Sequence, residues 1–247
     1  MKIAVAGGTG VVGMPTVEAV RSAGHEPVVL SRSAGVDLIT GKGLETALDG
    51  VEAVIDTANV STLNADAATE FFTAATSNLI AAAERAGARH LVLLSIVGID
   101  RIPYDYYAGK VAQEKVVEAS SVPWTILRAT QFHEFAGQMF ERAKFGPLRL
   151  APRARTQPIA AAEVGERLAA LAAGAPQGRA RDLAGPREEA LDSMVKAYAK
   201  TKGHRGWVPS ISIPTKQMKG MRAGLALPGL GADLGRQTFA EWLAGQR

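Results

Sequence analysis

A glycine-rich segment near the start of the chain restricts the possible folds more than any other feature. It spans residues 7–13, reads GGTGVVG, and follows the short apolar run of residues 2–6. Residues 11–23 have the apolar spacing of a helix, which Gly24 is expected to end. A strand that passes into a helix through several glycines indicates an α/β fold, because the turn needs backbone angles that glycine adopts at no steric cost.

Strand and helix signals alternate through the first half of the chain. Repeated strand–helix–strand units predict a parallel sheet with helices on both faces, which is a Rossmann-type, doubly wound α/β fold. Ligands of such sheets bind beyond the carboxyl ends of the strands, so functional residues are expected directly after each strand. Strands are expected at residues 2–6, 27–30, 53–56, 90–94 and 124–127, an extended piece at 36–38, and helices at 11–23, 44–48, 65–86 and 106–119.

The alternation is weaker after residue 128. Since no repeat or linker interrupts the 247 residues, we expect one domain over 1–247, in which residues 131–157 and 185–247 form a smaller, C-terminal substrate-binding lobe. The second half predicts a loop at 144–158, helices at 160–173, 188–202 and 238–243, a last strand at 181–183, and a glycine- and proline-punctuated segment at 203–235.

Composition argues against several classes of function. The chain has no cysteine, and its four histidines are scattered, so no metal site is expected. The net charge of +4 comes from dispersed basic residues, which does not predict a nucleic-acid partner. No apolar run is long enough to span a bilayer and no signal peptide is recognisable. These features predict a cytoplasmic protein without a membrane partner, a monomer or homodimer that acts on a small molecule.

The glycine-rich turn predicts a dinucleotide site. A pyrophosphate must approach the main chain more closely than a Cβ atom permits, and the N-terminus of the following helix offers free N–H groups and a partial positive charge. An ordinary tight turn is the alternative, but the preceding strand and the following apolar helix provide the context that the motif requires. The residues expected to bind the phosphates are Gly7, Thr9, Gly10, Val11, Val12 and Gly13.

The end of the second predicted strand indicates which dinucleotide binds. A site for NAD places an acidic residue there to hold the ribose hydroxyls. This chain has Ser31, Arg32 and Ser33 instead. A guanidinium between two hydroxyls suits a 2′-phosphate, which a carboxylate would repel. A solvated surface arginine is the alternative, and the position of Arg32 favours NADP(H) over NAD(H).

Tyr106 and Lys110 stand four residues apart at the start of a predicted helix and share one face of it. A nearby ammonium would lower the pKa of the phenol and would also suit a nicotinamide ribose. With a carbonyl substrate, Tyr106 would give a proton to the oxygen as hydride arrives. The same spacing occurs by chance on many helices, and Tyr107 is a competing candidate, so both interpretations stay open.

Together these residues resemble the short-chain dehydrogenase/reductase superfamily, in its atypical NmrA-like branch. The resemblance covers roughly residues 1–170 and depends on residues 7–13, Arg32 and the spacing of Tyr106 and Lys110. It implies that Lys110 contacts the cofactor ribose. It also implies that Asp37 and Leu38 cover the adenine, that Ala58 and Asn59 line the cofactor, and that residues 126–128 with Gln131, Phe132 and His133 line the nicotinamide and the substrate.

One position departs from that family. The resemblance implies a pair of serines after the strand before the tyrosine helix, the second being catalytic, whereas this chain has Ser95 followed by Ile96. Ser95 is expected to substitute for the missing hydroxyl or to touch the cofactor, which leaves the triad of Ser95, Tyr106 and Lys110 incomplete. His133 is expected to orient the substrate or to cap the next helix.

The leading hypothesis is therefore an NADP(H)-dependent oxidoreductase of the atypical short-chain type, acting on a small carbonyl, quinone or related conjugated compound. One alternative is an NAD(P)-sensing regulatory protein without turnover, which Ile96 favours. Another is an epimerase or isomerase that uses the cofactor transiently.

Overall fold

A computed structural model describes residues 1–146 and 148–246 of the chain. Its internal contacts divide the chain into two compact units. Unit 1 comprises residues 1–96, 103–128 and 162–181, and unit 2 comprises residues 97–102, 129–161 and 182 to the C-terminus.

Unit 1 is built on a parallel sheet whose strands come from the apolar runs of the sequence. Residues of β1, β3 and β4 are almost entirely buried, as expected for a sheet covered on both faces. Ile3 of β1 lies opposite Pro27 on one side and Ala53 on the other. The strands are β1 (Lys2–Ala6), β2 (Glu26–Leu30), β3 (Ala53–Asp56), β4 (His90–Ile96) and β5 (Trp124–Ala129), in the spatial order β5-β4-β3-β1-β2, and β10 (Gly178–Arg179) pairs with β5.

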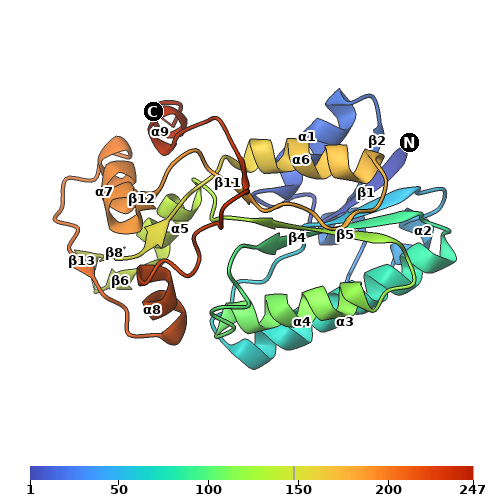
Figure 1. Cartoon of the computed structure of the whole chain (residues 1–247), viewed down its shortest axis with the longest axis horizontal. Coiled ribbons are helices and arrows are strands. Elements are labelled where there is room, and N and C mark those ends of the chain that lie inside the picture. The colour runs from blue at the N-terminus through green and yellow to red at the C-terminus, as the bar shows by residue number, and fades with distance from the viewer. Residues whose placement is uncertain (147, 247) are drawn as a thin grey trace. The chain divides into compact units, whose positions relative to one another are not determined.

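Helices cover both faces of this sheet (Figure 1). On one face α3 (Ala65–Arg85) packs along α4 (Tyr106–Glu118), and α1 (Gly13–Ser22) lies with α6 (Ala161–Ala173) on the other. Glycines allow both helix pairs to approach closely, since a Cβ on Gly109 would lie 2.7 Å from the Cβ of Ala68. A Cβ on Gly165 would likewise lie 2.8 Å from the backbone of Pro15. The predicted doubly wound α/β fold is confirmed.

The helix ends follow from local side-chain chemistry. Asn64 begins α3, because its side-chain oxygen accepts a hydrogen bond from the Ala67 N–H at 2.8 Å. Gly24 and Gly87, with φ of 78° and 71°, follow the last turns of α1 and α3. The predicted stop at Gly24 is confirmed. Unit 1 also contains a short helix, α2 (Leu44–Ala47).

Unit 2 combines four helices with pairs of very short strands. Phe140, Tyr198, Trp242 and Phe239 form a chain of ring contacts with centroid separations of 6.1, 6.4 and 5.6 Å. The helices are α5 (Phe135–Arg142), α7 (Leu191–Thr201), α8 (Lys216–Arg222) and α9 (Phe239–Ala244). The strand pairs are β6 (Lys144–Phe145) with β7 (Leu148–Arg149), β8 (Ala151–Pro152) with β13 (Ser210–Ile211), β9 (Arg155–Thr156) with β12 (Glu189–Ala190), and β11 (Leu183–Ala184) with β14 (Asp233–Leu234).

Several predicted elements of the second half are wrong. The segment 144–158, predicted as a loop, contains strands β6 to β9. These strands are two residues long, too short to show the alternation of polar and apolar residues by which a strand is predicted. The sequence also does not predict α5, and α7 begins at Leu191 instead of residue 188, because β12 occupies residues 189–190.

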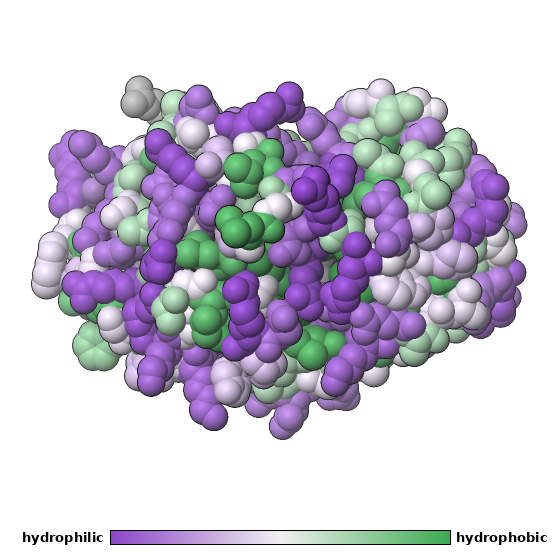
Figure 2. Space-filling view, in the orientation of Figure 1, coloured by the Kyte–Doolittle hydropathy of each residue, from purple (hydrophilic) through white to green (hydrophobic). Residues whose placement is uncertain are grey.

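No helix among residues 1–146 and 148–246 is both long and apolar enough to cross a membrane. On the face drawn in Figure 2, hydrophilic residues cover much of the surface and hydrophobic residues lie between them.

Candidate cofactor and active site

The glycine-rich turn joins β1 to α1 and packs against two neighbouring strand ends. Gly7 has φ 71°, and a Cβ on it would lie 2.8 Å from the Thr57 carbonyl oxygen. A Cβ on Gly13 would lie far inside van der Waals contact of the Gly7 carbonyl oxygen. The Gly7 N–H donates to the Leu30 carbonyl at the end of β2, at 3.2 Å. The turn is therefore fixed between the ends of β2 and β3 and has no room for side chains at either glycine.

The outer surface of this turn suits an anion. Thr9 and Gly10 are exposed, and so is Val11, at 41%. The first turn of α1 contains no acidic residue. A helix N-terminus carries a partial positive charge and is a favourable place for a phosphate group.

Ser31, Arg32 and Ser33 directly follow β2. Ser31 begins a short 3₁₀ helix, η1 (Arg32–Ala34), where its Oγ accepts from the Ala34 N–H at 3.2 Å and lies 2.9 Å from the Ser33 Oγ. The Arg32 side chain is exposed. Within the described part of the chain, its guanidinium has no hydrogen-bond or ion-pair partner. The guanidinium is therefore available to an external anion.

Asp37 and Leu38 lie in the loop that follows η1. This loop forms a turn instead of the predicted extended piece, because the Asp37 carboxylate accepts from the N–H groups of Ile39 and Thr40 at 2.8 and 3.2 Å. From α3, the Asn78 amide donates to the carbonyl oxygens of Leu38 and Ile39 at 3.0 and 2.7 Å. The loop is thus held by hydrogen bonds within itself and by Asn78 of α3.

The loop after β3 brings Ala58 and Asn59 to the start of α4. The Tyr106 hydroxyl donates to Oδ1 of Asn59 at 2.7 Å. A Cβ on Gly7 would lie 2.9 Å from the Ala58 Cα, so the same loop also contacts the glycine-rich turn. The structure therefore brings together the predicted cofactor residues Gly7 and Asn59 and the predicted catalytic residue Tyr106.

The pKa of Tyr106 is raised, which corrects one expectation. Burial raises the pKa of Tyr106, and the neighbouring Tyr107 raises it further. The predicted lowering by Lys110 is wrong, because the Lys110 ammonium donates to the carbonyl of Leu94 at 2.8 Å and to the side-chain oxygen of Gln113. Tyr106 and Lys110 share a helix but contact different groups.

Lys110 is almost completely buried, with 4% of its surface exposed. Burial lowers the pKa of Lys110 to about 8, although the carboxylates of Asp56 and Glu114 favour the charged form. Its Nζ also lies 4.8 Å from the centroid of the Phe72 ring, an additional favourable contact for a cation. Two of its three N–H groups donate to Leu94 and Gln113.

Three buried polar residues beside Lys110, namely Asp56, Thr76 and Gln113, are not predicted from the sequence. Asp56, the last residue of β3, accepts hydrogen bonds from the Ala58 N–H at 2.9 Å, the Thr76 hydroxyl at 3.0 Å and the Gln113 amide at 3.0 Å. Burial raises the pKa of Asp56 despite the opposing charge of Lys110. Two signals were present in the sequence: an acid that closes an apolar strand, and a glutamine three residues after Lys110 on one helix face.

Ser95 contacts an ion-pair network centred on the buried carboxylate of Glu114. Its hydroxyl donates to Oε1 of Glu114 at 2.5 Å. Glu114 also accepts from Arg128 at 2.9 and 2.8 Å and from Arg179 at 2.9 Å. Burial would raise the pKa of Glu114, but these hydrogen bonds outweigh it and lower the pKa. The Ser95 proton is thus engaged by Glu114, and Ile96 offers no second hydroxyl.

One residue predicted to orient the substrate lies in the interior of unit 2. His133 is 0% exposed, and its Nε2 lies 3.1 Å from the Gln237 carbonyl oxygen. Its ring lies 5.8 Å from the rings of both Phe239 and Trp242. These contacts place His133 within the aromatic cluster of this unit.

Gln131 and Phe132 precede His133 in the same unit. The Thr156 hydroxyl donates to Oε1 of Gln131 at 2.7 Å, and Gln131 is 8% exposed. Phe132 forms an isolated parallel bridge with Ile159. Their predicted roles at the nicotinamide and substrate stay predictions.

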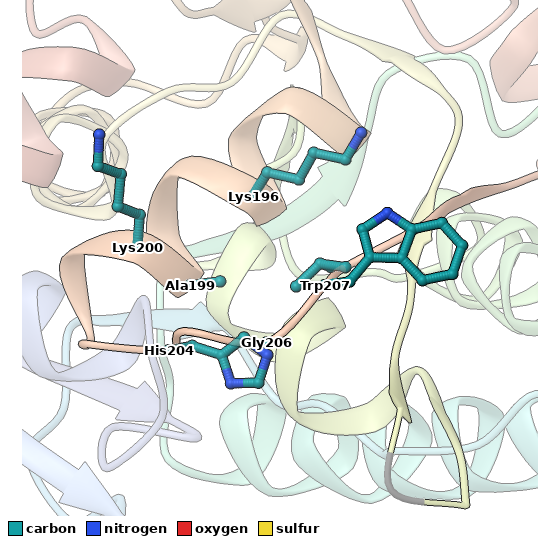
Figure 3. Close-up of a pocket in the computed structure, with 7 residues that line it drawn as sticks. Lys196, Ala199, Lys200, His204, Gly206 and Trp207 are labelled. Atoms are coloured by element: carbon teal, nitrogen blue, oxygen red, sulfur yellow. The ribbon is translucent and has the colours of Figure 1, made fainter.

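Unit 2 also contains a pocket of about 360 Å³. Helix α7 contributes two lysines, and the loop after it contributes an imidazole and an indole ring (Figure 3). Trp207 is 75% exposed. None of the residues predicted for the cofactor or for catalysis lines this pocket, whose walls are Lys196, Ala199, Lys200, His204, Gly206, Trp207 and Val208.

Solved structures share the fold of this chain. NADPH-dependent quinone oxidoreductase QOR2 of Escherichia coli, complexed with NADPH, is 18% identical, with a TM-score of 0.72 over 99% of both chains. A short-chain dehydrogenase/reductase superfamily protein of Agrobacterium tumefaciens with bound NAD is 15% identical, with a TM-score of 0.67 over 99% of this chain and 95% of that one. UDP-N-acetylglucosamine 4-epimerase of Bacillus cereus is 18% identical, with a TM-score of 0.69 over 100% and 96%. These likenesses concern the fold alone.

Comparison by sequence leads further. No curated protein sequence matches the chain. The model of a family described as NAD(P)H-binding matches residues 7–173, from the first glycine of the turn to the end of α6. Because this match covers more than half of the 247 residues, the chain belongs to the NAD(P)H-binding family.

Proposed function

We propose that this protein is an NADP(H)-dependent oxidoreductase that reduces a small carbonyl, quinone or related conjugated compound. The observation that carries the proposal is the exposed Arg32 guanidinium, which has no partner among the described residues. Arg32 lies directly after β2, the strand whose end contacts the glycine-rich turn. Bidentate hydrogen bonds from arginine match the geometry of a phosphate group.

The residues of unit 1 fit a bound dinucleotide. The close contacts around Gly7 and Gly13 leave a bare backbone surface for a pyrophosphate. We assign the 2′-phosphate to Arg32 with the hydroxyls of Ser31 and Ser33, and a ribose hydroxyl to the third N–H of Lys110. The other cofactor contacts are assigned to Thr9, Gly10, Val11, Val12, Asp37, Leu38, Ala58 and Asn59.

Tyr106 is assigned the role of proton donor. When bound, the nicotinamide supplies the hydride for the substrate carbon. The Tyr106 phenol carries its proton at neutral pH, as a donor to a substrate oxygen must, and burial raises its pKa and so makes it a weaker acid than a free phenol. At rest this proton is shared with Asn59 Oδ1, which a substrate oxygen would replace as the acceptor.

A titration with the four nicotinamide dinucleotides in one buffer tests the proposal. NADPH and NADP⁺ are expected to bind at least about tenfold more tightly than NADH and NAD⁺, since a hydrogen bond to a charged group contributes about 1.5–3 kcal/mol. Arg32→Ala should weaken the binding of NADPH by about 10–100-fold and leave NADH nearly unaffected. Arg85→Ala, an exposed arginine in the last turn of α3, is the matched control. Equal affinities of wild-type protein for NADPH and NADH would contradict the assignment of Arg32.

A sensor of the nucleotide redox state, without turnover, is the second candidate. Two observations favour it: Glu114 engages the Ser95 hydroxyl, and Ile96 lacks a hydroxyl at the position that is catalytic in the resembling family. A sensor should prefer one oxidation state strongly and consume no NADPH with any quinone or carbonyl offered. Nucleotide that copurifies in tightly bound form would instead favour the epimerase or isomerase alternative.

A further inference from the structure

We propose that Asp56 is a positioning residue that holds both halves of the proposed active site, the loop that contacts Tyr106 and the ammonium of Lys110. The roles of Tyr106 and Lys110 rest on the proposed function, whereas the hydrogen bonds of Asp56 do not depend on it. Asp56 lies at the carboxyl end of β3 and is 1% exposed. A carboxylate buried to this degree needs several partners, and each partner is correspondingly fixed.

One carboxylate oxygen fixes the loop after β3. Oδ1 of Asp56 accepts from the Ala58 N–H at 2.9 Å. Oδ1 of the next residue, Asn59, accepts a hydrogen bond from the Tyr106 hydroxyl at 2.7 Å. The backbone that carries the partner of Tyr106 is thereby tied to Asp56.

The other oxygen acts on Lys110 through Gln113. Oδ2 of Asp56 accepts from Nε2 of Gln113 at 3.0 Å and from the Thr76 hydroxyl at 3.0 Å. The opposite end of the same amide, Oε1 of Gln113, accepts from Nζ of Lys110. An amide has one donating and one accepting end, so only this orientation satisfies both charged partners. Gln113 therefore connects the buried carboxyl group of Asp56 with the buried amino group of Lys110.

Few charged groups surround Lys110, which makes the charge of Asp56 important for its protonation. Among the described residues, the charged groups that face Lys110 are Asp56 from β3 and Glu114 from α4 itself. The elements α3 and β4 present the Phe72 ring and the Leu94 carbonyl. Glu114 already accepts from two arginines and from Ser95. Asp56 is thus the main compensating charge for the ammonium, and without it the neutral amine would be favoured.

The decisive experiment follows the titration of Lys110 in the cofactor-free protein by NMR of ¹³C-labelled lysine, with Lys110→Met to assign its resonance. In Asp56→Asn and in Gln113→Leu, the midpoint for Lys110 is expected to fall by about one pH unit or more, because each variant removes compensation for the positive charge. Asp49→Asn, which removes one negative charge at an exposed position, is the matched control and should leave the midpoint unchanged. Thermal unfolding shows whether each variant is folded. If Asp56→Asn does not fold, the midpoint for Lys110 in Gln113→Leu decides the test.

The outcomes separate this inference from the proposed function. An unchanged midpoint for Lys110 in a folded Gln113→Leu or Asp56→Asn protein overturns the inference, whatever NADPH does. A lowered midpoint in a protein that binds no NADPH supports the link from Asp56 to Lys110 and refutes the cofactor assignment. If NADPH binds, its affinity should also begin to fall at a lower pH in both variants than in wild-type protein.

Discussion

The hydroxyl of Tyr106 lies 2.7 Å from Oδ1 of Asn59, so the loop after β3 holds the first residue of α4. These two residues are 47 positions apart in the sequence. The contact fixes the direction of the hydroxyl on a ring that also packs edge-on against Phe72, with centroids 5.6 Å apart. In the proposed reaction, a substrate oxygen would meet a donor whose direction is already fixed, which favours proton transfer.

Replacement of Tyr106 by phenylalanine tests this donor. Turnover of NADPH with an accepted substrate should fall by at least about 100-fold, because only the hydroxyl is lost. The dissociation constant for NADPH should change by less than about threefold, since the ring and its packing remain. The matched variant is Tyr107→Phe, the competing candidate on the same helix. Full turnover in Tyr106→Phe together with a loss in Tyr107→Phe would transfer the role to Tyr107.

Gly13→Ala tests the close contact inside the glycine-rich turn. The new methyl group would overlap the Gly7 carbonyl oxygen, which is held in the turn by the Gly10 N–H at 2.8 Å. We expect a loss of about 1–3 kcal/mol in the free energy of unfolding and strongly weakened binding of NADPH. Gly229→Ala is the control, because a Cβ there would meet no atom within 4 Å. Urea unfolding should find the control within about 0.5 kcal/mol of wild type.

Glu114→Gln should destabilise the protein by about 2 kcal/mol at neutral pH, since it weakens the hydrogen bonds from Arg128 and from the partly exposed Arg179. The pKa of Glu114 is lowered in the folded protein. Its carboxylate therefore contributes stability above the unfolded pKa of 4.5, and this contribution is lost as the pH falls through the folded pKa. Chemical unfolding at neutral and acidic pH measures both effects. Glu118→Gln, at an exposed partner of Arg179, should cost about 0.5 kcal/mol, and equal effects of the two variants would count against the network.

Because the pKa of Lys110 is lowered, we expect the free energy of unfolding to depend on pH in the alkaline range. Its pKa of about 8 lies below the unfolded value of 10.5, so between these values the folded protein binds fewer protons than the unfolded chain. Stability should therefore rise with pH through this window, by up to about 3 kcal/mol relative to Lys110→Met, which cannot titrate there. Unfolding of both proteins from pH 7.5 to 10.5 provides the comparison. Parallel curves would show that Lys110 keeps an ordinary pKa.

Asp105, directly before Tyr106, has the strained backbone angles φ 52° and ψ −131°, and its side chain makes no capping hydrogen bond. Glycine adopts these angles at no steric cost, so Asp105→Gly should raise the free energy of unfolding by about 1 kcal/mol. Asp105→Ala keeps the strain and should not stabilise the protein. Thermal melts of the two variants distinguish them, and a gain in both would assign the effect to the carboxylate instead of the backbone.

The sequence predicts the elements of unit 1 well because its strands are buried apolar runs and its helices end at glycines. It also predicts the glycine-rich turn and the position of Arg32 directly after β2, since both depend on neighbours close along the chain. Gln113 and Asp56 escape prediction because they are 57 positions apart and meet only in the folded sheet. The direction of the Lys110 ammonium escapes it too, because helical spacing gives a shared face but not the acceptor that a flexible side chain finds.

Gly109 stands between Tyr106 and Lys110 on α4, and a side chain there would collide with the backbone of Ala68 on α3. The absence of a side chain at Gly109 therefore determines how closely α4 can pack against α3. A related chain with the same tyrosine and lysine but a bulky residue between them would hold both groups at a different height above the strand ends. The residue that faces the neighbouring helix thus belongs to the signature by which this kind of site should be recognised in other sequences.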